Sequence, residues 1–439
     1  HDNNRDWYAF TPEETQLTVE KAHNAWHPQI VHDIHQMGGG GARIFFPPYI
    51  DPWDPNIDPG LTMAVNQLGT YMAAELTAGG KSGVVVQAIY DAYTPARAYQ
   101  HYHGGARILS ETASADLATP VEVDPADLAG GRGYDAAARS WNYPWPWEGG
   151  RWGLPEIVDY MESGAMALLT HAARNRSYWL QNFLEVGERA ITVADGAPEA
   201  WLIPDDPSAR PAIDYALRIL AMGDVEVHRA EAPFTVDGER YPRGTWVVPM
   251  RQPYGSFVQT LLEQQVYPNL REYPGGPPRR PYDVTAHTLP LLFGFEAEPV
   301  HSPLGVALSD PIDPPALDFR LPPELSGDAA PRVAIYKGYQ EPMEAGWTRW
   351  VFDQHGLVYD TLHDATVRAG NLNERYDVIL LQDQSPASIS RGFPEGSLPD
   401  EYVGGMGETG LRALRDFVRN GGRLVAIEEA TDLAIDLFD

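Results

Sequence analysis

The chain of 439 residues contains no cysteine and only three lysines, Lys21, Lys81 and Lys337. The absence of cysteine excludes disulfide bonds, thiolate zinc ligands and cysteine nucleophiles. Long apolar runs are absent too, and none approaches the roughly 20 residues that a membrane-spanning helix requires. We therefore expect no membrane span and no chemistry that depends on a thiol.

Positive charge is scarce relative to negative charge. The 61 acidic side chains outnumber the 32 basic ones and give a formal net charge of −29. A surface of this sign repels phosphate backbones and anionic membranes, so we expect no nucleic-acid partner. Hydrophobic residues make up 43% of the chain, a proportion that is normal for a folded globular protein.

The order of apolar segments and helix signals predicts an α/β protein with three domains. We expect a first domain over residues 1–190, an accessory α/β domain over 195–305 and a last α/β domain over 328–439. A composition shift at residues 196–198 marks the first boundary, and a proline-rich segment over 311–323 marks the second. Strands alternate with helices in the last domain, which predicts a parallel, flavodoxin-like sheet.

Helices and short strands also alternate in the first domain, and the segments between them are rich in glycine, proline and tryptophan. Such segments are typical of loops. We expect helices over 13–26, 61–78 and 155–186, strands over 29–34, 84–89 and 106–109, and mostly loop over 38–59 and 115–153.

Three short patches hold side chains suited to a site that binds or cleaves peptides. Asn4-Arg5 offers a planar guanidinium fork that can hold a carboxylate. His35 lies near the end of a predicted strand, where sites in open α/β sheets occur, whereas His32 points to the opposite face. Glu111 follows a short predicted strand, and a carboxylate is costly to bury without a partner or a role.

Taken singly, each patch also fits a plain surface role. Arg5 could form an exposed ion pair with Asp2 or Asp6, and Glu111 could be one of many exposed loop acids. The order of the three patches along the chain is more informative than any one of them.

Together the patches resemble the zinc carboxypeptidases of the carboxypeptidase A-like family. That family carries an Asp-x-Asn-Arg-(Asn/Asp)-aromatic patch, matched by residues 2–7, then a helix and a strand that ends in Asp-x-His, matched by residues 33–35. A tyrosine then precedes the catalytic glutamate, as Tyr90 stands 21 positions (111 − 90) ahead of Glu111. Tyr93, Tyr99 and Tyr102 compete for this role, and the resemblance covers about residues 1–190.

The resemblance implies a mixed-sheet domain and a role for each matched residue. The family takes its first two zinc ligands from a His-x-x-Glu motif upstream of the Asn-Arg patch, so the remaining ligands are expected upstream of His1 and the domain is expected to lack its N-terminal part. Zinc would lower the pKa of a bound water toward ~7, and a carboxylate would take its proton. Asn4 and Arg5 would bind the terminal carboxylate of a peptide, His35 would be a zinc ligand, Tyr90 would close over the substrate and Glu111 would be the general base.

These expectations add up to a zinc-dependent metallocarboxypeptidase acting on peptides with a free C-terminus. The alternative is a non-catalytic protein that binds peptides or cell-wall material on a carboxypeptidase-like scaffold. A metal-free hydrolase with paired carboxylates ranks third, because no second acid is distinctively placed beside Glu111.

Two further expectations concern the rest of the protein. The last domain resembles the class I glutamine amidotransferase-like fold but has no catalytic cysteine, so Ser385 is weighed only as a remote candidate nucleophile. We expect the full-length protein to be secreted or periplasmic, although no signal peptide is visible in this chain.

Overall fold

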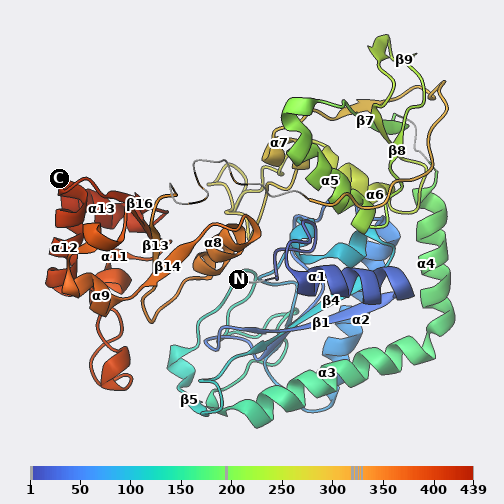
Figure 1. Cartoon of the computed structure of the whole chain (residues 1–439). Helices are drawn as coiled ribbons and strands as arrows, with labels where there is room; N and C mark the ends of the chain where they lie inside the picture. The colour runs from blue at the N-terminus through green and yellow to red at the C-terminus, as the bar shows by residue number, and fades with distance from the viewer. Residues whose placement is uncertain are drawn as a thin grey trace. The chain divides into compact units, whose positions relative to one another are not determined.

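The computed structural model describes residues 3–192, 196–317 and 330–438, together with positions 321, 325 and 327. The chain forms two compact units, one over residues 3–317 and one after Leu317 (Figure 1). Helices and sheets make up both units, which confirms the predicted α/β class. Within the described part of the chain, no helix combines the length and the apolar character that crossing a membrane would demand.

The first unit contains a mixed four-stranded sheet of order β1-β4-β2-β3. Strands β1 and β4 are parallel, β4 and β2 are antiparallel, and β2 and β3 are parallel. The elements of this part are α1 (Glu13–Thr18), the π-helical turn η1 (Val19–Asn24), β1 (Ile30–Met37), β2 (Ile44–Phe46), α2 (Pro59–Ala78), β3 (Val84–Val86), the 3₁₀ turns η2 (Pro95–Arg97) and η3 (Tyr99–Tyr102), β4 (Ala106–Ala113), β5 (Val121–Val123), η4 (Pro125–Asp127), β6 (Gly150–Trp152), α3 (Leu154–Arg174) and α4 (Arg176–Ala190).

Strand β4 is twice as long as the predicted strand over 106–109, and this changes the setting of Glu111. All eight residues of β4 pair with β1, from Ile30 opposite Ala106 to Met37 opposite Ala113. Glu111 therefore lies inside a strand and not after it. The polar residues at 110–112 hid this extension in the sequence, but backbone pairing with β1 on one side and β2 on the other holds them.

Other local predictions also needed correction. Strand β2 lies inside the segment 38–59 that we expected to be loop, because its three buried residues are flanked by glycine and proline. The short pair β5 and β6 lies inside the expected loop over 115–153. The long helical region expected over 155–186 consists of two helices, α3 and α4, which meet at Asn175.

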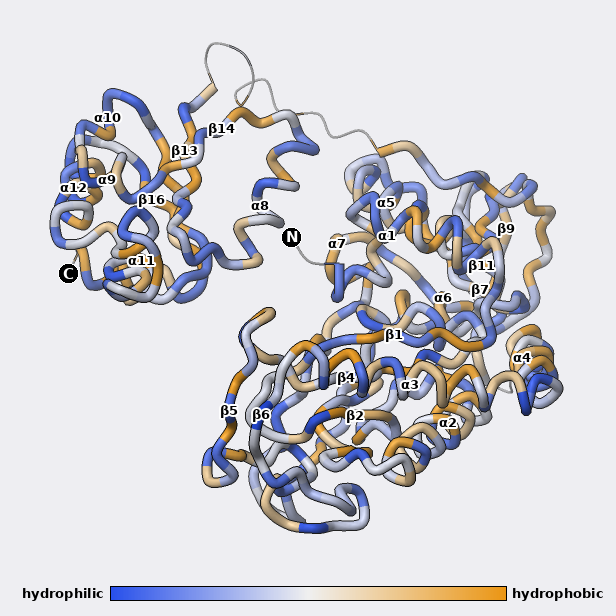
Figure 2. Tube along the Cα trace, turned by 90° about the horizontal axis from the view of Figure 1, so that it is seen from below, coloured by the Kyte–Doolittle hydropathy of each residue, from blue (hydrophilic) through white to orange (hydrophobic). Residues whose placement is uncertain are grey.

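Helix α2 covers one face of this sheet. Asp58 caps it by accepting from the backbone N–H groups of Gly60 and Leu61, and Pro59 occupies its first turn. One stripe of the helix is buried, including Leu61, Leu68 and Met72, and packs against β2, β3 and β4, with α3 alongside. In Figure 2 the tube is orange, and hence apolar, along β2.

The segment after residue 196 adds a second sheet of order β12-β7-β11-β8, which is antiparallel throughout. Its residues join the same hydrophobic core as the first sheet, and Phe257 stacks on Phe10 with ring centroids 6.3 Å apart. The elements here are β7 (Ala200–Ile203), η5 (Pro207–Ala209), α5 (Arg210–Met222), β8 (His228–Arg229), β9 (Phe234–Val236), β10 (Glu239–Tyr241), β11 (Trp246–Pro249), α6 (Gly255–Leu262), α7 (Leu289–Phe293) and β12 (Glu298–Val300).

The second unit contains a fully parallel sheet of order β14-β13-β15-β16. This order is that of the first four strands of a flavodoxin-like sheet. Strand β14 was not predicted, because two of its four residues are polar and exposed. The elements are β13 (Val333–Tyr336), α8 (Met343–Gln354), β14 (Tyr359–Leu362), α9 (Asp364–Ala369), α10 (Leu372–Arg375), β15 (Val378–Leu381), α11 (Pro386–Arg391), η8 (Asp400–Tyr402), α12 (Gly407–Arg419), β16 (Arg423–Ala426) and α13 (Ala430–Phe438).

The close approach of α2 to the loop after β2 yields a stability prediction. A Cβ atom at Gly69 would lie 2.1 Å from the carbonyl oxygen of Pro47, a contact that only a backbone shift can relieve. We expect Gly69→Ala to lower the free energy of unfolding by about 1–3 kcal/mol, measured by denaturant unfolding. Gly187→Ala is the matched control, because a Cβ there meets nothing within 4 Å, and it should be neutral or stabilising by up to ~1 kcal/mol. Equal effects of the two changes would contradict the packing argument.

Candidate functional site

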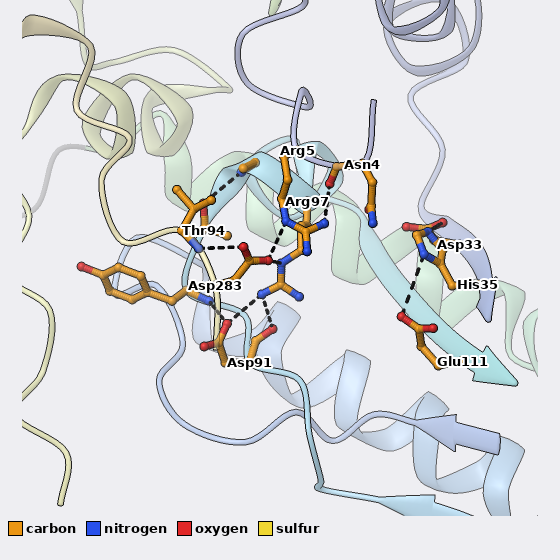
Figure 3. A network of polar contacts seen from close by, with 12 residues as sticks. Asn4, Arg5, Asp33, His35, Asp91, Thr94, Arg97, Glu111 and Asp283 are labelled. Carbon is orange, nitrogen blue, oxygen red and sulfur yellow. Dashed lines mark hydrogen bonds and ion pairs between the residues drawn. The ribbon is translucent and has the colours of Figure 1, made fainter. Parts of the chain in front are cut away.

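Four ionisable side chains share one face of the β1–β4 pair. Side chains alternate along a strand, and His35 stands opposite Glu111 while Asp33 stands opposite Leu109. Arg107 and Glu111 on β4 therefore face the same side as Asp33 and His35 on β1. Figure 3 shows Asp33, His35 and Glu111 gathered together on this side.

The His35 ring is held from one nitrogen and presents the other. Its Nε2 lies 2.7 Å from Oδ1 of Asp33, and its Nδ1 lies 3.9 Å from Oε1 of Glu111. The Asp33 carboxylate is fixed in turn by Arg107, whose Nε donates to Oδ2 at 3.1 Å. This chain of contacts sets the ring orientation and leaves Nδ1 directed toward the Glu111 carboxylate.

The electrostatics of the group follow from burial and from these contacts. Burial alone would raise the pKa of Asp33, but the Arg107 charge and the hydrogen bond with His35 lower it well below its usual range. The hydrogen bond with Asp33 raises the pKa of His35. Burial raises the pKa of Glu111, which is only 7% exposed. A carboxylate with a raised pKa is a stronger proton acceptor than one in water.

Tyr90 is the tyrosine that faces this group. Its hydroxyl lies close enough to interact with Glu111, and burial together with the Glu111 charge raises the pKa of the phenol. The preceding residue, Ile89, has a φ of 59°, a left-handed conformation that is costly for a β-branched side chain. The Ile89 N–H donates to the Arg132 carbonyl at 2.8 Å, which holds the strained turn in place.

The competing tyrosines have other partners. The Tyr99 hydroxyl donates to Asn24 at 2.7 Å, and the Tyr102 hydroxyl donates to Asp54 at 2.9 Å. The Tyr93 ring packs edge-on against Tyr267, with centroids 4.8 Å apart. None of these interactions involves Glu111.

Arg5 belongs to a second cluster that contains another arginine. Arg5 Nε lies 2.7 Å from Oδ2 of Asp283, and Arg97 Nε lies 3.0 Å from the same oxygen. Arg97 also donates to Oδ1 of Asp91 at 2.7 Å, and both of these side chains are buried. The two arginines thus converge on one carboxylate, as Figure 3 shows. The surface ion pair of Arg5 with Asp6 does not form, because Asp6 is buried and accepts from Thr11.

Local backbone contacts explain why Arg5 and Arg97 meet. The Thr94 hydroxyl accepts from the Ala96 N–H and caps the turn η2 that carries Arg97. The carbonyl of Ala96 then accepts from the Trp7 N–H at 3.2 Å. This bond ties the segment that follows Arg5 to η2. The backbone carbonyl of Asn4 accepts from Nη1 of Arg5 at 2.9 Å. Asp2, the other acid named as a partner of Arg5, lies outside the described residues.

Tyr282 joins the two clusters. Its ring centroid is 5.2 Å from that of Tyr90 in an edge-on contact, and the Arg97 guanidinium lies 4.9 Å from the Tyr282 centroid. The charges of Arg5 and Glu111 both act on the Tyr282 phenol. The structure therefore places His35, Glu111, Tyr90 and Arg5 in one region.

The other histidines named in the sequence lie apart from this region. The ring of His32 contacts Ser110 on the opposite face of β1, at 2.9 Å. His101 and His103 are buried against backbone carbonyls, and burial lowers their pKa values to about 3 and about 4. They stabilise packing. In the second unit, Ser385 caps helix α11 by accepting from the Ser388 N–H, which is a structural role.

Sequence reasoning assigned no role to Arg97, Arg107, Tyr282 or Asp283. An arginine within the apolar and aromatic stretch of 84–109 is a weak signal that a buried charge requires a partner. Asp283 carries no such signal, because it lies far downstream in a polar, proline-rich loop.

The side chains at the site could provide one zinc ligand, but not a complete set. His35 offers a free ring nitrogen, and Asp33 supports the ring from the other side, as carboxylates do for metal-bound histidines. A catalytic zinc normally takes three protein ligands. Across residues 3–192, 196–317 and 330–438 no group of three or more His, Asp or Glu side chains is arranged to hold a metal.

The Asp33–His35 contact predicts a pH dependence. We expect the His35 ring to titrate above 6.5, so that the pair stabilises the fold below pH 6.5 and loses this contribution as the pH rises through the folded-state pKa. In Asp33→Asn the pKa of His35 should fall, because burial and the Arg107 charge both lower it. Ring chemical shifts followed by NMR report the pKa directly. Glu111→Gln should lower it less, and an unchanged pKa in Asp33→Asn would refute the assignment.

Comparisons with known proteins leave the family of the chain open. No family model matches the sequence, and no curated protein or solved structure matches it either. The assignment of a function therefore depends on the residues of the site and on their geometry.

Proposed function

We propose that this chain contributes the substrate-binding residues and the general base of a zinc-dependent carboxypeptidase-type site. Such a site hydrolyses peptides from a free C-terminus. The observation that carries the proposal is the His35 ring, which is fixed by Asp33 and directs its free nitrogen toward the buried Glu111 carboxylate at 3.9 Å. Arg5 and Tyr90 lie in the same region and supply the two further groups that such a site requires.

Glu111 acts as the general base in this proposal. Burial raises the pKa of its carboxyl, and the Tyr90 side chain lies beside it. The carboxylate takes a proton from the attacking water and returns it to the nitrogen of the leaving amine. Tyr90 shields the reacting atoms from solvent and holds Glu111 in position through its hydroxyl.

His35 would be the zinc ligand contributed by these residues, with Asp33 fixing its tautomer. Bound zinc polarises a scissile carbonyl and lowers the pKa of water. In this proposal, zinc takes its remaining ligands from other residues.

Arg5 binds the terminal carboxylate of the substrate. Its guanidinium is partly exposed, with 37% of the side chain accessible, and it already holds a carboxylate at 2.7 Å. A guanidinium can also form planar, charge-assisted hydrogen bonds with a carboxylate, which a neutral amide cannot match. A peptide with a free C-terminus is therefore the substrate class that fits.

A second candidate function is peptide binding without catalysis. It is favoured by the single histidine ligand that the described residues bring to the site. The carboxylate-binding arginine would serve this function equally well, so the fate of the peptide bond separates the two candidates.

The first test concerns the base. In the protein expressed from its complete gene, Glu111→Gln should reduce peptide hydrolysis by about 10²–10⁴-fold, because the amide cannot accept the proton. The zinc content should stay unchanged. Glu122→Gln, at an exposed position of β5, is the matched control and should retain full activity. A Glu111→Gln protein with undiminished activity would eliminate the base assignment, and an unmodified protein that binds but never cleaves peptides would favour the binding function.

The second test concerns the carboxylate. Arg5→Ala should raise the KM for a peptide with a free C-terminus by about tenfold or more, since a charge-assisted hydrogen bond contributes roughly 1.5–3 kcal/mol. Binding of the C-terminally amidated peptide should change little. Arg139→Ala removes an exposed arginine elsewhere and controls for the loss of charge. Equal losses on the free and amidated peptides would show that Arg5 does not read the carboxylate.

A further inference from the structure

The two arginines of the site already bind a carboxylate of the protein itself. Oδ2 of Asp283 lies within 3.0 Å of both Arg5 Nε and Arg97 Nε. The Asp283 side chain is only 12% exposed, and its other oxygen accepts from the Val284 N–H. Asp283 thus stands where the proposed function puts the carboxylate of a peptide.

The neighbouring residue, Tyr282, contacts side chains of both clusters. The Tyr282 ring packs edge-on against Tyr90 and lies beneath the Arg97 guanidinium. The Tyr90 hydroxyl in turn interacts with the Glu111 charge. The segment Tyr282-Asp283 therefore presents an aromatic ring to Tyr90 and a carboxylate to the arginines, the two groups that a C-terminal aromatic residue would carry.

The charges of the cluster explain why a substrate carboxylate can take the place of Asp283. Arg97 retains the buried carboxylate of Asp91 whether or not Asp283 is present. Asp283 is the ion-pair partner of Arg5, and a substrate carboxylate could replace it without a change in net charge.

The segment belongs to a long irregular connection whose two ends are joined. The stretch from Glu263 to Thr288 contains no helix or strand longer than an isolated bridge, and all of it is described. The Thr288 hydroxyl donates to the Glu263 carbonyl at 2.8 Å and closes the base of this connection. Irregular connections of this length on a rigid scaffold are typically functional loops.

We propose that Tyr282 and Asp283 form an internal occupant of the substrate site, and that a peptide binds only by displacing them from Arg5, Arg97 and Tyr90. This inference rests on the proposed function, because it takes the arginines as the seat of the substrate carboxylate. Displacement lowers the apparent affinity by the fraction of molecules in which the site is free. Removing the internal carboxylate therefore strengthens binding at the same arginines.

The test compares binding of one small probe to matched variants of this chain. N-acetyl-L-phenylalanine carries a ring and a carboxylate, and its amide lacks the charge. Calorimetry should show that Asp283→Asn binds the acid about tenfold more tightly than the unmodified protein, with no gain for the amide. Asp400→Asn removes one negative charge from an exposed position of the second unit and should leave both affinities unchanged.

A second pair of variants tests whether the gain in affinity arises at Arg5 and Tyr90. Tyr282→Ala retains the carboxylate but removes the ring that packs on Tyr90, so it should give a smaller gain. Arg5→Ala combined with Asp283→Asn should abolish the gain. Thermal unfolding establishes that each variant is folded.

Three outcomes would overturn the inference: an unchanged or weaker affinity in Asp283→Asn, an equal gain for the amide, or no binding of the acid by any variant. These are separable from a failure of the proposed function, which is judged by hydrolysis in Glu111→Gln. If the protein never cleaves peptides but binds the acid more tightly after Asp283→Asn, the inference of an internal occupant stands and the proposed enzymatic function fails.

Discussion

The buried ion pair between Arg107 and Asp33 is the contact on which the geometry of the site depends. Arg107 is only 4% exposed, and a guanidinium at that depth requires a carboxylate beside it. Parallel pairing of β1 with β4 places Asp33 within reach. With Asp33 fixed, its second oxygen holds the His35 ring, and the free nitrogen of the ring is directed at Glu111.

This arrangement gives Asp33 and Glu111 different properties, although both are partly or wholly removed from water. The Arg107 charge keeps Asp33 ionised, whereas burial raises the pKa of Glu111. Environments that shift neighbouring carboxyl groups in opposite directions are typical of sites where one group orients and the other exchanges a proton.

The second cluster follows a related rule with a different consequence. Arg97 pairs with Asp91 in the buried interior, but Arg5 is partly exposed and pairs with Asp283 from a loop. A charge pair that is made by a loop at the protein surface is one that a ligand of the same charge can replace. The arginine that suits a substrate carboxylate is therefore also the group that holds the internal occupant.

The sequence by itself determined the α/β class, most helices and the buried strands, because apolar periodicity and capping residues act locally. It also singled out His35, Glu111, Tyr90 and Arg5 by residue type and order. It did not determine that Glu111 lies within β4, because strand extension across polar residues depends on pairing with β1 and β2. Only the tertiary structure decided that Asp283 would meet Arg5 and Arg97, since no local pattern links a loop residue to partners far upstream in the chain.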